Sequence, residues 1–231
     1  MKDLGPHDLH LWHANADMPP DAALAQLQPQ ERERARRFVF ERDRARHLAT
    51  RWLVRRVLSR YAPVAAADWR FGANAHGRPH IDAPALGEPL HFSLSHSEEA
   101  VLLLVGRQAE LGVDVEGHRA GDADAIALQV FAPAERAWLH ASPDAEGQRF
   151  LTLWTLKEAY IKARGQGLSM PLQRFALLPE GSDGARLQAG PEIDADAAGW
   201  RFWRGTLRPG LPWAVAVRDG RARLRVFDAA G

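Results

Sequence analysis

The chain has 231 residues, a formal net charge of +1, 46% hydrophobic residues, 26% charged residues and no cysteine. This composition is that of an ordinary globular protein of one large domain or two small lobes, and the lack of cysteine excludes disulfides, cysteine-ligated zinc and cysteine nucleophiles. The longest wholly apolar run, residues 100–105, is far shorter than the roughly 20 residues of a membrane span, and the N-terminus lacks a signal-peptide pattern. We therefore expect a cytoplasmic protein.

The near-zero net charge conceals two asymmetries. Residues 31–60 hold eleven arginines against four acids, which makes this window +7 and the remainder of the chain −6. Lysine is rare, because 27 of the 30 basic residues are arginines and the only lysines are Lys2, Lys157 and Lys162. A lysine ammonium is compact and can approach a single oxygen, which a planar guanidinium does not do. Two lysines five residues apart therefore suggest a task that arginine performs poorly.

The first half of the chain predicts a helical region followed by strands. Residues 21–62 read as helical, with Pro29 near a helix start and a break at Pro63, and residues 69–89 are rich in turn-forming residues. The strands that follow are predicted at residues 90–95, 100–105 and 111–116. We expect these three strands to form an antiparallel meander.

The second half repeats this order. Pro133 is placed to open a helix, and a further predicted helix, residues 149–164, ends at Gly165. Strands are then predicted at residues 175–178, 200–207, 212–217 and 222–227. A helix followed by a meander, twice, predicts two similar lobes with a boundary shortly after Glu116.

Two carboxylates share one face of the strand predicted at residues 111–116. Because side chains alternate along a strand, Asp114 and Glu116 lie opposite Val113 and Val115. Neighbouring carboxylates repel one another unless a cation lies between them, and oxygen ligands without histidine or cysteine suit Mg²⁺. The alternative is a solvated strand face near a turn at Gly117.

The helix predicted at residues 149–164 carries a stripe of three functional side chains. Trp154, Glu158 and Lys162 are four residues apart and so lie on one side. A third carboxylate and an ammonium directed at Asp114 and Glu116 would form a metal–phosphate site. The alternative is a surface Glu–Lys pair worth about 0.3–0.5 kcal/mol, which the rarity of lysine disfavours.

Ser95 and His96 stand at the end of the strand predicted at residues 90–95. A Ser-His-Asp hydrolase is the rival interpretation, but adjacent residues of an extended chain point to opposite faces and no Gly-x-Ser-x-Gly elbow is present. A phosphate contact and a merely local hydrogen bond both stay open for His96.

Basic side chains that could bind phosphate occur in the arginine-rich helix and in the turn Gly77-Arg78-Pro79. Most of the eleven arginines are equally well explained as a solvated helix face. No P-loop or Gly-x-Gly-x-x-Gly follows a predicted strand, so ATP-binding and dinucleotide-binding folds lack support.

In chain order, several short motifs together resemble the Sfp-type 4′-phosphopantetheinyl transferases. The match runs from about residue 27 to Leu172, and the order and spacing of the motifs are more specific than any one of them. The motifs are Phe38 with Arg46-His47, Gly77-Arg78-Pro79, Phe92 to Ser97, Gly112 to Glu116, Phe131 with Glu135, and Trp154-x-x-Lys157-Glu158-x-x-x-Lys162.

The resemblance implies an α+β fold: a pseudo-twofold monomer of two similar lobes, each an antiparallel sheet packed against a long helix, with the active site between them. The expected lobes are residues 1–116, with the nucleotide contacts and first metal carboxylates, and residues 117–231, with the Trp154–Lys162 motif. It implies an enzyme, a holo-[acyl-carrier-protein] synthase, which transfers the 4′-phosphopantetheine arm of coenzyme A to a serine of an acyl or peptidyl carrier protein and releases 3′,5′-ADP.

The resemblance also implies a role for each candidate residue. Asp114, Glu116 and Glu158 would hold Mg²⁺, for which Mn²⁺ is a possible substitute. Glu158 or a metal-bound water is the candidate base, and Glu158, Lys162 and His96 form the expected catalytic set. Contacts to coenzyme A would come from Arg34, Arg46, His47, Arg78, Ser95, His96 and Lys162.

Two positions depart from the family pattern. Glu31 stands where relatives often carry a basic residue that helps to hold the 3′-phosphate, which leaves that contact to Arg34. Val115 supplies no third ligand between the two strand acids, so Glu158 or water must complete the metal shell.

Two other classes of function compete with this interpretation. An inactive carrier-protein-binding module should have lost one of the acidic residues or Lys162, and none is missing. A basic RNA-binding module would need aromatic residues exposed among the arginines, whereas Trp52 is predicted on the apolar side of its helix. We expect neither nucleic acid nor membrane as a partner. The natural carrier and its pathway (fatty acid, polyketide, nonribosomal peptide or amino-acid reductase) stay open.

Overall fold

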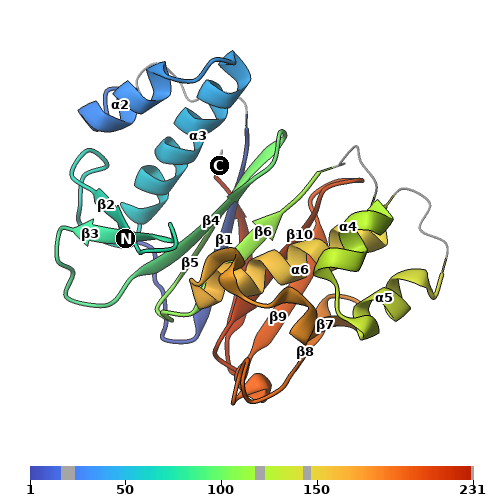
Figure 1. The fold of residues 1–231 in the computed structure, drawn as a ribbon. Coiled ribbons are helices and arrows are strands. Elements are labelled where there is room, and N and C mark those ends of the chain that lie inside the picture. Colours follow the sequence, from blue (N-terminus) through green and yellow to red (C-terminus); the bar gives the residue numbers. More distant parts are fainter. Residues whose placement is uncertain (17–23, 118–122, 143–146, 230–231) are drawn as a thin grey trace.

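The computed structural model describes residues 1–16, 24–117, 123–142 and 147–229 and has a mixed α+β architecture (Figure 1). The helices are α2 (Pro29–Arg36), α3 (Glu41–Leu58), α4 (Ala123–Val130), α5 (Pro133–His140) and α6 (Gln148–Arg164), with 3-10 turns at Gly167–Ser169, Leu172–Arg174 and Ala197–Gly199. The strands are β1 (Asp8–Asn15), β2 (Arg70–Ala73), β3 (Pro79–Ala83), β4 (His91–His96), β5 (Ala100–Gly106), β6 (Leu111–Val115), β7 (Phe175–Glu180), β8 (Gly184–Ala189), β9 (Arg201–Thr206), β10 (Pro212–Val217) and β11 (Arg223–Asp228).

Two large sheets form the centre of the fold. One has the strand order β11-β1-β5-β4 and the other β6-β10-β9, while β2–β3 and β7–β8 are separate hairpins. Strands β1 and β11, from opposite ends of the described chain, pair in parallel, and β6 pairs with β10 in antiparallel orientation. Each large sheet therefore contains strands from both sides of residue 116, and the division into lobes at that residue stays a prediction.

Strand β5 explains why the chain contains an uninterrupted apolar run. Val101, Leu103 and Val105 pack in the core beneath α3, whereas the alternate residues Leu102 and Leu104 pack in the core between the two sheets. A strand buried on both faces has no polar face and so reads as a continuous apolar segment. This strand is shared by two cores.

The predicted mixture of helices and strands is correct, but several predicted elements change. The helical region is two helices, interrupted at residues 37–40, and its predicted first residues, 21–23, lie outside the described part of the chain. The three-stranded meander is wrong, because β6 leaves its chain neighbours and pairs with β10. The sheets are not wholly antiparallel, because β1 and β11 are parallel. The sequence patterns also missed β1, whose partners are distant in the sequence, the short strands of the β2–β3 hairpin, and β8.

Helix α6 crosses β6 and β10 in the middle of the molecule (Figure 1). It ends as predicted at Gly165, whose φ of 66° suits glycine at a helix terminus. On its buried side, Lys157 donates to Glu135 Oε2 at 2.7 Å and to the carbonyl oxygen of Phe175 at 2.9 Å. Glu135 also accepts from the backbone amides of Ala132 and Leu177. Lys157 therefore joins α5, α6 and β7 rather than facing the candidate site.

We predict that Lys157→Met destabilises the fold by about 3–5 kcal/mol, because it leaves the Glu135 carboxylate buried without its counter-charge. Both side chains are essentially inaccessible to solvent, at 1% and 0% exposure. Urea unfolding followed by circular dichroism measures the loss, and the double variant Glu135→Gln/Lys157→Met should recover part of it. A Lys157→Met protein as stable as the wild type would contradict this role.

Candidate active site

Serine side chains join the facing edges of the two large sheets. Ser93 Oγ accepts a hydrogen bond from the amide of Val113 at 3.2 Å, and Ser95 Oγ accepts one from the amide of Val115 at 3.3 Å. Both serines lie on β4 and are buried. β6 is an edge strand of its sheet, and buried amides at a sheet edge need acceptors. The hydroxyls of Ser93 and Ser95 accept from these amides in place of a neighbouring strand.

A serine, an aspartate and a lysine meet at this junction. Ser95 Oγ donates to Asp114 Oδ1 at 2.7 Å, and Lys162 Nζ donates to Asp114 Oδ1 at 2.6 Å and to Ser95 Oγ at 2.9 Å. With the Val115 amide, the Ser95 hydroxyl thus uses its one donor and both acceptor positions. Asp114 is 2% exposed, whereas the Lys162 side chain is 29% exposed. The cluster opens to solvent on the lysine side.

Gly112 allows this meeting of strand and helix. A Cβ atom placed there would overlap the carbonyl oxygen of Ala159 and crowd the amide nitrogen of Ala163 at 2.5 Å. The backbones of β6 and α6 are therefore in direct contact, with no side chain between them. This close approach lets a lysine on α6 reach an aspartate two residues further along β6.

The remaining strand acid contacts the same helix. Trp154 Nε1 donates to Glu116 Oε1 at 3.0 Å. Trp154, Glu158 and Lys162 occupy successive turns of α6, so the half-buried Glu158 lies between the residue that contacts Glu116 and the residue that contacts Asp114. The structure thus brings Trp154 and Lys162, the two ends of the helical stripe, into contact with the strand acids Glu116 and Asp114.

The donor set at this place suits a hard divalent cation. Asp114 Oδ2 is buried and has no hydrogen-bond partner within the described chain, which is costly for a carboxylate oxygen that nothing else neutralises. Carboxylate oxygens are the ligands that Mg²⁺ prefers. Within the ranges that the structure describes, however, no three Asp, Glu or His side chains lie close enough together to hold a metal ion.

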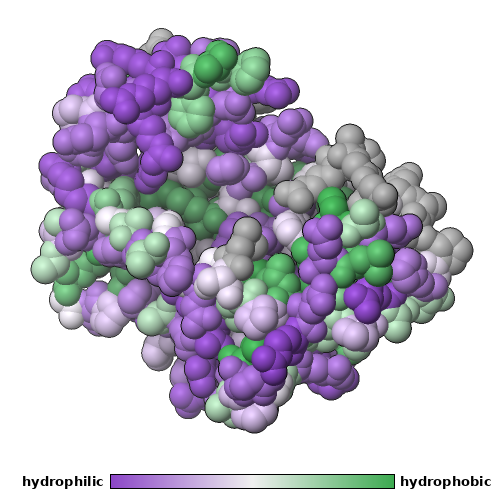
Figure 2. All heavy atoms as spheres, in the orientation of Figure 1, coloured by the Kyte–Doolittle hydropathy of each residue, from purple (hydrophilic) through white to green (hydrophobic). Residues whose placement is uncertain are grey.

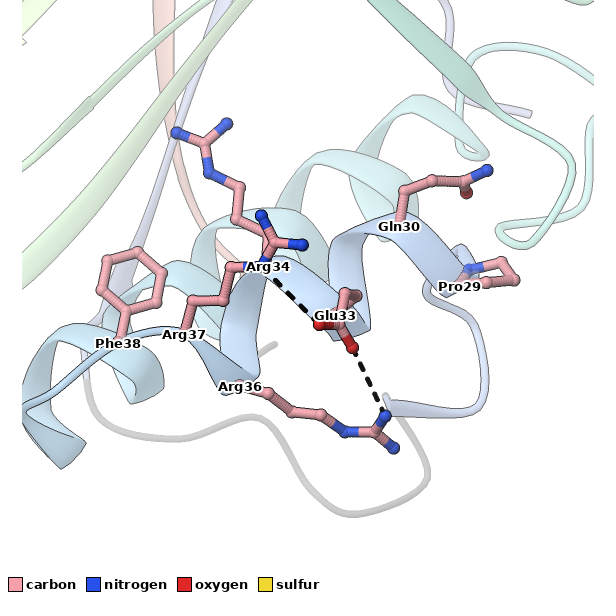
Figure 3. Close-up of a pocket in the computed structure, with 7 residues that line it drawn as sticks. All are labelled: Pro29, Gln30, Glu33, Arg34, Arg36, Arg37 and Phe38. Carbon is pink, nitrogen blue, oxygen red and sulfur yellow. Dashed lines mark ion pairs between the residues drawn. The ribbon is translucent and has the colours of Figure 1, made fainter.

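Three of the predicted nucleotide residues, Arg34, Arg46 and His47, lie near the start of α3, whereas Arg78 lies elsewhere. Burial and the positive charges of Arg51 and Arg34 lower the pKa of His47 to about 4, and its buried Nε2 has no partner within the described ranges. Arg46 pairs with Asp43 at 2.7 Å. An open hollow of about 980 Å³ beside α2 is lined by Pro29, Gln30, Glu33, Arg34, Arg36, Arg37 and Phe38 (Figure 3).

His96 links the two groups of residues. It ends β4 one residue after Ser95 and is exposed. Partial desolvation and the nearby positive charges of Arg46 and Lys162 lower its pKa. The imidazole is therefore neutral at pH 7, with an acceptor nitrogen beside two cations, an environment that also favours an anionic ligand.

Two other residues chosen from the sequence make structural contacts. Glu31 accepts from Arg55 at 2.7 Å and from the Gln28 amide at 3.0 Å, so its carboxylate caps α2 and neutralises a fully buried arginine. Arg78 donates to backbone carbonyl oxygens of Ala109, Leu111 and Ala163. Sequence reasoning counted Asn74 among the turn-forming residues of 69–89 but gave it no role at the site, although its side chain shapes the turn before Arg78.

Comparison with known proteins identifies the family. A model of the 4′-phosphopantetheinyl transferase superfamily matches residues 110–217, and a model of the N-terminal part of a 4′-phosphopantetheinyl transferase matches residues 12–108. The 4′-phosphopantetheinyl transferase HetI of Nostoc sp. is 32% identical over 189 residues, which cover 80% of this chain and 79% of HetI. The chain belongs to the Sfp-type 4′-phosphopantetheinyl transferase family.

Two relatives from Bacillus subtilis also support the membership of this transferase in the family. A 4′-phosphopantetheinyl transferase is 35% identical over 158 residues, covering 68% of each chain. The 4′-phosphopantetheinyl transferase Sfp of strain 168 is 36% identical over 152 residues, covering 65% of this chain and 66% of Sfp. Membership of this family identifies the chain as an enzyme. No described helix is both long and apolar enough to cross a membrane.

We predict that Gly112→Ala lowers transferase activity by at least tenfold and stability by about 1–3 kcal/mol, because the added methyl group forces α6 away from β6. Activity assays and thermal unfolding measure the two effects. Gly220→Ala is the matched control, since a Cβ there meets no atom within 4 Å. Full activity in Gly112→Ala would show that the close approach of the backbones is not required.

Proposed function

We propose that the transferase moves the 4′-phosphopantetheine arm of coenzyme A to a serine hydroxyl of an acyl or peptidyl carrier protein and releases 3′,5′-ADP. The observation that carries this proposal is the Ser95–Asp114–Lys162 cluster at the junction of the two sheets, with its unpartnered Asp114 oxygen. A fixed ammonium beside acidic side chains suits a reaction whose substrate is a pyrophosphate and whose catalysis depends on charge and positioning.

Asp114, Glu116 and Glu158 are the residues that would hold Mg²⁺ in the active transferase. The unpartnered Asp114 Oδ2 and the all-oxygen donor set support this assignment. When bound, the ion supplies Lewis-acid stabilisation of charge on the pyrophosphate. Mn²⁺ is the expected substitute, because it favours the same oxygen ligands.

The chain's own residues account for the proton and the charge in the proposed step. Glu158 takes the proton of the carrier serine, whose oxygen then forms a bond to the phosphorus that bears the pantetheine arm. The bond from that phosphorus to the bridging oxygen breaks, and the bridging oxygen leaves on 3′,5′-ADP. Lys162 stabilises the negative charge at the phosphoryl group, since its ammonium is held at the site by Asp114 and Ser95.

We assign the nucleotide end of coenzyme A to the basic group near the start of α3. Arg34 is exposed in the hollow, and the neutral His47 has a buried nitrogen without a partner in the described residues. His96 lies near both Arg46, which belongs to this group, and Lys162. The Ser95 hydroxyl already forms hydrogen bonds with Lys162 and Asp114. It would have to give up one of its hydrogen bonds to contact a phosphate.

We also propose that the transferase acts as a monomer of two related lobes. Support comes from the two long helices, because α3 packs on the β4–β5 sheet and α6 packs on the β6–β10 sheet. The proposed active site lies where those sheets meet, at β4 and β6. Coenzyme A would then extend from the α3 side towards Lys162.

We predict that Glu158→Gln reduces transfer by at least 100-fold without unfolding the protein, because the amide can neither accept the serine proton nor supply a charged ligand. The assay is mass spectrometry of apo carrier proteins incubated with coenzyme A, Mg²⁺ and the transferase. The exposed Glu180→Gln is the matched control. Wild-type turnover in excess chelator would contradict the Mg²⁺ assignment, and failure of every carrier to gain phosphopantetheine would contradict the proposed function.

The carrier protein is proposed to approach over α2 and the start of α3. Figure 2 shows a hydrophobic patch in this otherwise hydrophilic region. Val39 and Phe40 are 88% and 61% exposed, with Phe38 beside them. Among the described residues, Arg36 and Arg37 form long, exposed ion pairs of 3.6 Å with Glu33, which an acidic partner can replace at little cost.

We predict that Arg36→Glu/Arg37→Glu raises the KM for an acidic carrier protein by about tenfold and flattens the dependence of its association rate on salt. The KM for coenzyme A should change little. The double variant Arg221→Glu/Arg225→Glu, which reverses two exposed charges on and before β11, is the control. An increase confined to the KM for coenzyme A would instead place the nucleotide against these arginines.

A further inference from the structure

The turn of the β2–β3 hairpin contacts the C-terminal end of α6. Asn74 Oδ1 accepts hydrogen bonds from the amides of His76 and Arg78, both at 2.9 Å, and Gly77 has a φ of 83°. The same Asn74 side chain donates through Nδ2 to the carbonyl oxygen of Gly165 at 2.9 Å. Asn74 therefore shapes the turn and fixes it to the residue that ends α6.

Arg78, in the same turn, connects the end of α6 to the segment that leads into β6. Its guanidinium donates to the carbonyl oxygen of Ala163 at 3.0 Å, to that of Ala109 at 2.6 Å and to that of Leu111 at 3.2 Å. The last carbonyls of a helix have no partner within the helix, and a cation there also interacts favourably with the helix dipole. One side chain thus satisfies the end of α6 and the start of β6 together.

The two connected segments are those that carry the active-site contact. Ala163 directly follows Lys162, and Leu111 precedes Asp114 by three residues on β6. The fit is close, because a Cβ at Gly165 would lie 3.0 Å from Arg78 Cδ. Displacement of Arg78 would therefore release the end of the helix whose lysine reaches Asp114.

We propose that Arg78 is a positioning residue of the transferase, which holds Lys162 on α6 against Asp114 on β6 by linking the backbones of both elements, and that its side chain does not bind the nucleotide. The turnover part of this inference rests on the proposed function. Its structural part, the coupling of Arg78 to the end of α6, stands independently of the reaction.

The choice of arginine separates the two roles experimentally. A planar guanidinium can donate in several fixed directions to carbonyls of two segments, whereas an ammonium acts as a point charge. Lysine at position 78 would keep the charge that a nucleotide phosphate needs but lose the bridge. Arg78→Lys should therefore behave like Arg78→Ala if Arg78 positions α6, and like the wild type if it binds phosphate.

The experiment compares Arg78→Lys and Arg78→Ala with Arg204→Ala. Arg204 is the matched control, because its guanidinium donates to the carbonyls of Gly181 and Gly184 at the β7–β8 turn. We expect both Arg78 variants to lower kcat for carrier modification by at least tenfold with a change in the KM for coenzyme A of less than twofold. Amide hydrogen exchange in residues 158–166 should accelerate in both, and neither effect should occur in Arg204→Ala.

Several results would overturn the proposal. A rise in the KM for coenzyme A with unchanged kcat in Arg78→Ala, rescued by Arg78→Lys, would make Arg78 a nucleotide ligand. Unchanged kcat and unchanged exchange in residues 158–166 would show that Arg78 holds nothing in place. If the wild-type enzyme modifies no carrier protein, the proposed function fails, while the exchange comparison still decides whether Arg78 fixes the end of α6.

Discussion

The direct backbone contact between α6 and β6 at Gly112 is the constraint on which the rest of the site depends. Most helices pack on sheets through a layer of side chains, but here a single Cβ would overlap the helix backbone. The short distance lets Lys162 form a 2.6 Å ion pair with Asp114 from the neighbouring element. No side chain lies between helix and strand at this point, so the orientation of α6 also depends on contacts elsewhere along its length.

Those contacts are distributed along the whole helix. Trp154 bonds to Glu116 in the first half of α6, Lys157 forms a buried ion pair with Glu135 near its middle, and Arg78 binds the backbone of its last turn. The ion pairs of Lys157 and Lys162, both on α6, differ in how completely their charged atoms are buried and bonded. Lys157 and Glu135 are fully buried and well bonded, whereas the Lys162–Asp114 pair has one buried oxygen without a partner among the described residues and a lysine that is partly exposed. Incomplete satisfaction of a buried polar network is unfavourable for stability, and the ligand proposed for this site would supply the missing partner.

Local periodicity could predict which side chains share a face, but not which elements meet. The strand alternation correctly places Asp114 with Glu116, away from Val113, and the helix spacing correctly places Glu158 between Trp154 and Lys162. Neither pattern contains information on the pairing of β6 with β10, because that pairing joins segments about a hundred residues apart in the chain. Composition likewise marked Lys157 and Lys162 as equally unusual, although a helix turns their side chains in different directions. Only the environment of each lysine shows that one supports the core and the other reaches the site.

The ion pairs of the transferase differ in how easily a binding partner could replace one of their members. At the junction of the sheets, the Lys162–Asp114 pair is 2.6 Å long and its carboxylate is buried, and losing one partner of a buried pair typically costs about 3–5 kcal/mol. Over α2, the pairs of Arg36 and Arg37 with Glu33 are 3.6 Å long and exposed, a class worth about 0–1 kcal/mol. A protein substrate can therefore exchange its own acids for those of α2 without disturbing the fold. Arg36 and Arg37 thus place replaceable contacts on the surface proposed to receive the carrier, while the proposed chemistry depends on the short Lys162–Asp114 pair.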